Sequence, residues 1–149
     1  MWSSIYDYFV QMFAGLRWSA FLAQNNENIV QATQMRNVFR NDLYSISGMM
    51  MIGLTLGTAV IYYFVGNRRG GSGYAFKTKF WFMAMLINSM GVAMIMMYFS
   101  MAMTTAYSTL HPFKFCLALG FTNLIYSAVL FFLFSILFKK YSVASTTPF

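Results

Sequence analysis

The chain has 149 residues, of which 59% are hydrophobic and only 9% are charged. A soluble domain carries about 25% charged residues, because it must build a wettable surface. The composition therefore excludes an ordinary soluble domain and predicts an all-α polytopic integral membrane protein.

The net charge of +7 comes from ten Lys and Arg residues against three Asp and Glu residues. Six of the ten cations lie close to the ends of apolar runs, namely Arg68, Arg69, Lys77, Lys79, Lys139 and Lys140. Cations at such positions set the topology of membrane proteins and attract anionic lipids. We therefore expect these six residues to contact phospholipid headgroups, and we expect no nucleic-acid partner.

Residues 1–23 repeat apolar side chains at helical spacing, but Asp7 and Arg17 interrupt them. A charge at the centre of a membrane span costs about 2.5–3.5 kcal/mol on insertion scales, whereas Trp-rich and Tyr-rich helices suit the headgroup boundary. The pattern predicts an interfacial helix, with a fourth membrane span as the alternative. Asp7 and Arg17 are too far apart to pair on one helix, so either is available to another subunit.

Residues 24–44 predict an amphipathic helix of about four turns, with apolar and polar residues on opposite faces. The apolar face holds Ile29, Ala32, Met35, Phe39 and Leu43, and the polar face holds Gln31, Gln34, Asn37 and Asn41. This helix lies along the membrane surface, docks on a partner, or covers the protein's own bundle. Residues 1–44 would thus form an N-terminal region of interfacial and amphipathic helices.

The remaining region, residues 45–149, is expected to be a transmembrane bundle with a short C-terminal tail. A hydrocarbon core of about 30 Å needs about 20 helical residues, and three apolar runs meet that length. The three predicted spans cover residues 45–65, 80–103 and 113–138. The positive-inside bias places the basic 66–79 loop and the C-terminal tail on one face and the polar 104–112 turn on the other.

Two features of the spans predict helix packing. Gly53 and Gly57 lie four residues apart, and this spacing lets two helix backbones approach closely. Asn88 is a polar residue within the second span, and such residues usually face another helix. We expect these three residues to make close helix contacts, either inside this chain or with another one.

No residue pattern predicts catalysis, a cofactor or a metal site. Metal sites need clustered His, Cys, Asp or Glu, whereas His111, Cys116 and the three acids are scattered along the chain. A Ser-His-acid group would require an acid near His111, and none is close in sequence. We therefore expect no enzyme activity, no cofactor and no metal.

The predicted function is that of a non-catalytic accessory or scaffold subunit, which packs on other membrane protein subunits and on phospholipid. An energy-transducing membrane, such as the mitochondrial inner membrane, is the favoured setting because the short loops are basic and the sequence shows no catalytic or cofactor-binding pattern. One alternative is a self-associating channel or pore, a homo-oligomer, and another is a viral or phage membrane protein. The pore would be lined by Thr55, Thr58, Asn88, Ser89, Thr122, Asn123 and Ser127.

Overall fold

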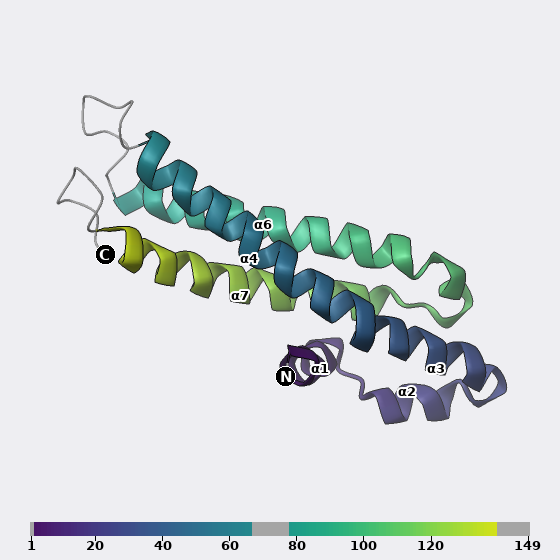
Figure 1. Ribbon diagram of the computed structural model, residues 1–149. Helices are drawn as coiled ribbons and strands as arrows, with labels where there is room; N and C mark the ends of the chain where they lie inside the picture. The colour runs from purple at the N-terminus through teal and green to yellow at the C-terminus, as the bar shows by residue number, and fades with distance from the viewer. Residues whose placement is uncertain (1, 67–77, 140–149) are drawn as a thin grey trace. The chain divides into compact units, whose positions relative to one another are not determined.

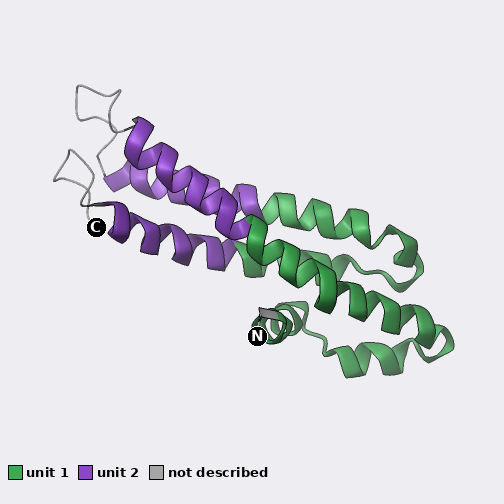
Figure 2. Cartoon of the chain, in the orientation of Figure 1, with its two compact units in different colours: residues 1–50, 93–123 green, residues 51–92, 124–149 purple. Residues whose placement is uncertain are grey.

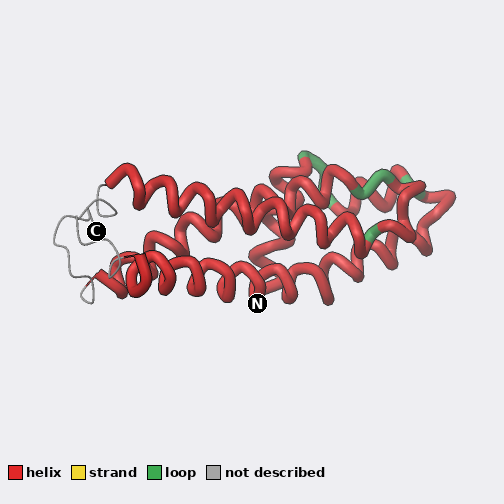
Figure 3. Tube along the Cα trace, turned by 90° about the horizontal axis from the view of Figure 1, so that it is seen from above, coloured by secondary structure: helices red, strands yellow, loops and turns green. Residues whose placement is uncertain are grey.

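The computed structural model describes residues 2–66 and 78–139, and within these ranges the secondary structure is entirely helical (Figures 1 and 3). The first half contains α1 (Trp2–Ala14), α2 (Trp18–Gln24), the 3₁₀-helix η1 (Asn26–Asn28), α3 (Ile29–Asn37), the π-helix η2 (Val38–Leu43), α4 (Tyr44–Val60) and the π-helix η3 (Ile61–Gly66). The second half contains α6 (Thr78–Met103), the 3₁₀-helix η5 (Thr105–Leu110) and α7 (Phe113–Lys139). The all-α fold class is therefore confirmed.

Within the part of the chain that the structure describes, three helices are long and apolar enough to cross a membrane. They cover Asn26–Val65, Thr78–Met103 and Phe113–Phe138. At 1.5 Å per residue, a helix of 26 residues is about 39 Å long, which exceeds a hydrocarbon core of about 30 Å. The second and third helices match the predicted spans within two residues at each end.

The first of these helices corrects one predicted boundary. The amphipathic helix was expected to end at residue 44, but the chain continues without a break from Asn26 to Val65, over 40 residues. Residues 38–44 contain neither Gly nor Pro, the residues that most often end a helix. The helix passes instead through the π-helical segment η2 and runs directly into α4.

Residues 2–24 form two short helices rather than one span. Helix α1 has 13 residues and α2 has seven, so neither reaches the length of about 20 residues that a bilayer requires. The break falls at Gly15, whose φ of 64° lies in the left-handed region that glycine adopts readily. The structure thus does not contain the alternative fourth span over residues 1–23.

Contacts divide the chain into two compact units (Figure 2). Unit 1 comprises Met1–Met50 and Ala93–Asn123, and unit 2 comprises Met51–Val92 and Leu124–Phe149. In unit 1, α2 packs on α3, α3 packs on η5, and α1 packs on η2. Helix α1 is seen nearly end-on in Figure 1 whereas α3 runs across the view, so α1 crosses the direction of α3.

The apolar face predicted for residues 24–44 is buried inside unit 1. Ala32, Met35, Phe39 and Leu43 are each 0% exposed, and only Ile29, at 41%, remains outside. The polar residues predicted on the opposite face, Gln31, Gln34, Asn37 and Asn41, are all exposed. Of the three alternatives, this face therefore covers the protein's own core.

The core of unit 2 is aromatic. Ala59, Tyr63, Trp81 and Phe131 form its buried cluster. The indole Nε1 of Trp81 donates a hydrogen bond of 2.9 Å to Ser135 Oγ, which satisfies a buried polar group where neither water nor lipid would do so. This bond connects α6 with α7.

Candidate functional site

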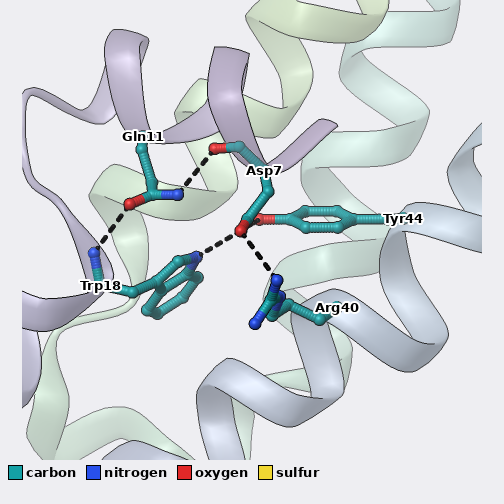
Figure 4. A network of polar contacts seen from close by, with 5 residues as sticks. All are labelled: Asp7, Gln11, Trp18, Arg40 and Tyr44. Carbon is teal, nitrogen blue, oxygen red and sulfur yellow. Dashed lines mark hydrogen bonds and ion pairs between the residues drawn. The ribbon is translucent and has the colours of Figure 1, made fainter. Parts of the chain in front are cut away.

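The carboxylate of Asp7 in α1 lies at the centre of a network of polar contacts (Figure 4). Asp7 Oδ1 accepts hydrogen bonds from Trp18 Nε1 at 2.9 Å and from the hydroxyl of Tyr44 at 3.3 Å. Asp7 Oδ2 lies 3.3 Å from Arg40 Nη2. One carboxylate thereby connects α1 with α2, η2 and α4.

Gln11 bridges the break between α1 and α2. Its Nε2 donates to the backbone oxygen of Asp7 at 3.0 Å, and its Oε1 accepts from the backbone nitrogen of Trp18 at 3.0 Å. The backbone N–H of Trp18 opens α2 and has no partner within that helix, so Gln11 satisfies a group that would otherwise be free. We call the set Asp7, Gln11, Trp18, Arg40 and Tyr44 the Asp7 clasp.

Aromatic packing fixes the clasp in unit 1. The ring of Trp18 stacks on Phe115 of α7, with centroids 4.0 Å apart and planes 6° apart. Tyr44 stacks on Tyr6 with centroids 5.6 Å apart, and the Tyr6 hydroxyl donates to Asn123 Oδ1 at 2.9 Å. Elements that are distant in sequence are therefore held together by both ring contacts and hydrogen bonds.

The geometry of the clasp supports a structural role. Both carboxylate oxygens of Asp7 are engaged, and its side chain is only 15% exposed. A buried carboxylate needs such partners to offset the loss of hydration.

The other two reactive side chains that the sequence analysis considered, Cys116 and His111, are not part of the Asp7 clasp. Cys116 is buried, with its Sγ 3.5 Å from Thr104 Oγ1, and His111 is exposed at a left-handed position with a φ of 48°. Within residues 2–66 and 78–139, no three His, Cys, Asp or Glu residues gather where they could hold a metal ion.

The sequence pattern does not identify the partner of Asp7. Arg17 is the nearest arginine in sequence, but the two residues cannot pair on one helix, so each is predicted to be available to another subunit. The structure pairs Asp7 with Arg40 of the same chain instead. An unpaired charge among apolar residues is energetically unfavourable, so the sequence indicates that Asp7 needs a cationic partner. It does not indicate which arginine that partner is.

Of the three residues predicted to make close helix contacts, one lies at an interface between helices of the described chain. Asn88 of α6 is 6% exposed, and its Nδ2 donates to Thr55 Oγ1 of α4 at 3.3 Å. Gly53 and Gly57 are exposed, and a Cβ added at either would meet nothing within 4 Å. These two glycines therefore approach no other helix of the described chain.

A glycine that the sequence pattern did not single out makes the close approach. A Cβ added at Gly120 of α7 would lie 3.2 Å from the carbonyl oxygen of Ala93 and 3.4 Å from Met97 Cβ, both on α6. Two helix backbones meet here in the way that small residues permit in membrane bundles.

The predicted lipid-contacting cations are only partly covered by the described residues. Lys79 is exposed, and its Nζ lies 5.2 Å from the centroid of the Phe80 ring. Lys139 is the last residue of α7. The remaining four, Arg68, Arg69, Lys77 and Lys140, lie outside the described residues.

Comparison with protein families, curated proteins and solved structures finds no match to this chain. Its function is therefore argued from its own residues.

Proposed function

We propose that the chain is a non-catalytic accessory or scaffold subunit of a larger membrane protein complex. The observation that carries this proposal is that most polar residues within residues 45–65, 80–103 and 113–138 are buried, while many large apolar side chains of the same segments are exposed. Such an exterior suits lipid and the apolar surfaces of other membrane proteins.

The burial of polar residues also weighs against a pore lined by them. Six of the seven residues predicted to line the pore are each between 0% and 6% exposed, namely Thr55, Asn88, Ser89, Thr122, Asn123 and Ser127. The seventh, Thr58, is half-buried. Several of them are also engaged, because Asn88 bonds Thr55 and Asn123 accepts from Tyr6. Residues that are buried in one copy do not line a water-filled path between copies, so the scaffold function is favoured.

Helix α4 and the first residue of η3 carry the surface that we propose for a partner helix. Gly53 and Gly57 are exposed with open space above them, and Ile61, four residues further, is 62% exposed. Glycines at this spacing let a second backbone approach closely and pack against the flanking apolar side chains. The partner is a membrane-spanning helix of another subunit, or of a second copy of this chain.

The test is to replace both glycines in the full-length protein. Gly53→Leu with Gly57→Leu should leave the chain folded, because no described atom outside the glycine's own stretch of helix lies within 4 Å of either added Cβ. We expect the partner to be lost from the complex purified in mild detergent. The matched control is Gly91→Leu on α6, where an added Cβ also meets nothing within 4 Å.

Co-purification that stays unchanged in the double variant would contradict the proposed contact. Identification of the co-purified chain by mass spectrometry separates a different subunit from a second copy. Conductance of the pure protein in planar bilayers would instead favour the channel.

For the setting, we propose an energy-transducing membrane such as the mitochondrial inner membrane. Support comes from the basic residues in the sequence of the 66–79 loop and from described residues that hold no metal-binding cluster. Exposed Lys79 sits beside the ring of Phe80 at the start of α6, and this combination suits the headgroup region. Fractionation of cells that express the tagged protein tests the setting.

A further inference from the structure

A hollow of about 380 Å³ opens beside the connection between α1 and α2, and Tyr8, Gln11, Met12 and Arg17 line it. Tyr8 is 66% exposed and Met12 is 50% exposed. The hollow thus combines a cation, a phenol hydroxyl, an amide and an apolar thioether at one accessible place in unit 1.

Arg17 is the cation of this hollow, and it is exposed. Among the described residues the structure shows no ion pair for its guanidinium, and Asp7, the acid of the neighbouring helix α1, is engaged by Arg40. Its five N–H donors match an oxyanion geometrically. Arg17 therefore provides an unmatched positive charge at the edge of the hollow.

Gln11 forms a fixed wall of the same hollow. Its side chain is held at both ends, by Asp7 O and by the Trp18 backbone nitrogen. An amide nitrogen carries two N–H groups, so one remains for a ligand after the bond to Asp7. A wall that is already held in place loses little conformational freedom when a ligand binds.

The outer face of α1 continues the apolar side of the hollow. Ile5, Tyr8, Met12 and Phe13 are between 37% and 66% exposed, and they follow one another at helical spacing. A helix with such a face lies in the boundary between headgroups and acyl chains. An anion that binds beside Arg17 would therefore have apolar surface next to it.

We propose that this hollow binds the phosphate of an anionic phospholipid. The guanidinium of Arg17 pairs with the phosphate, the Tyr8 hydroxyl and the free N–H of Gln11 donate to its oxygens, and an acyl chain lies along Met12 and Phe13. An acidic side chain of a partner protein would satisfy Arg17 but would leave the apolar face of α1 unused. This site does not depend on the glycine surface of α4 or on any partner subunit.

The experiment uses the full-length protein, purified in detergent and titrated with lipid under native mass spectrometry. The probes are phosphatidylglycerol, phosphatidylcholine and inorganic phosphate. We expect phosphatidylglycerol to bind at least fivefold more tightly than phosphatidylcholine, because choline neutralises the phosphate. We expect inorganic phosphate at millimolar concentration to displace little of the bound lipid, because it lacks the apolar part.

Arg17→Gln should abolish the preference for phosphatidylglycerol, with a loss of at least about fivefold in affinity, because the charge-assisted hydrogen bonds of the guanidinium are removed. Arg17→Lys should keep part of the preference because it retains the charge. The matched control is Lys114→Gln, which removes another exposed cation of unit 1 and should leave the affinity within about twofold. Tyr8→Phe, which removes only the hydroxyl, gives a second test should Arg17→Gln fail to fold.

Three results would overturn the proposal. One is equal binding of the two lipids by the natural protein, and another is an unchanged affinity in Arg17→Gln. The third is full displacement of lipid by inorganic phosphate, which would make the hollow a site for a soluble anion. Loss of a co-purified protein in Arg17→Gln with no change in lipid binding would assign Arg17 to a partner protein, and this also overturns the lipid site.

Discussion

Asp7 Oδ2 lies 3.3 Å from Arg40 Nη2, and the same carboxylate accepts from Trp18 and Tyr44 through its other oxygen. The side chain of Arg40 is 44% exposed whereas that of Asp7 is 15% exposed. Water therefore screens the ion pair from the side of Arg40, and the hydrogen bonds to the carboxylate contribute the larger part of the stability.

This difference gives the first prediction. Asp7→Ala leaves the indole of Trp18 and the hydroxyl of Tyr44 without their acceptor and should lower the free energy of unfolding by about 1–3 kcal/mol. Arg40→Ala removes only the screened pair and should cost less than about 1 kcal/mol. Thermal or denaturant unfolding in detergent, followed by circular dichroism, measures both. The control is Asp42→Ala, at an exposed acid of η2, which should change the free energy of unfolding little. Equal losses of stability in Asp7→Ala and Arg40→Ala would show that the ion pair dominates.

The second prediction concerns the close approach of α6 and α7 at Gly120. Gly120→Leu places a side chain against the Ala93 carbonyl, where a Cβ alone would already stand at 3.2 Å. A backbone atom moves less easily than the end of a side chain, so overpacking should cost about 1–3 kcal/mol or more. Gly91→Leu on α6 has open space around its Cβ and should be tolerated. Unfolding measurements on the two variants compare them, and equal stability would contradict the contact.

The third prediction concerns the bond between Trp81 and Ser135 in the core of unit 2. Removal of either partner should destabilise the protein, and a double-mutant cycle with Trp81→Phe and Ser135→Ala should give a coupling energy of about 0.5–1.5 kcal/mol, the range found for hydrogen bonds within membrane proteins. Ser89→Ala is the contrasting variant, because the Ser89 hydroxyl is buried without a hydrogen-bond partner among the described residues. Its removal should be neutral or stabilising. A coupling energy of zero would mean that the indole finds another acceptor.

The fourth prediction concerns sidedness, which rests on the basic loop. Cysteines introduced as Ser72→Cys and Ser108→Cys should react with a membrane-impermeant thiol reagent from opposite sides of sealed vesicles. Ser108 is exposed in η5, and the native Cys116 is 0% exposed, so Cys116 should stay unlabelled and serve as the internal control. Labelling of both new cysteines from the same side would reject this topology.

The helical class and the three apolar runs long enough to cross a membrane follow from the amino-acid sequence alone. Each of these runs lacks an interior charge and is bounded by polar or basic segments, so it can be recognised locally in the sequence. Because a bilayer has a nearly fixed thickness, the length of a run indicates whether it can cross the membrane. The buried face of residues 24–44 was also visible as a periodic pattern, because four of its five predicted apolar residues are buried.

The pairs of residues that contact each other become visible only when the helices are packed together. Periodicity says which face of a helix is apolar, but it does not say what lies opposite that face, so Arg40 rather than Arg17 compensates Asp7. For the same reason the close helix approach within the described chain occurs at Gly120 and not at the GxxxG pair. The continuity of the helix past residue 44 depended on η2, where a polar stretch with no helix breaker remains helical because its apolar side chains pack into the core of unit 1.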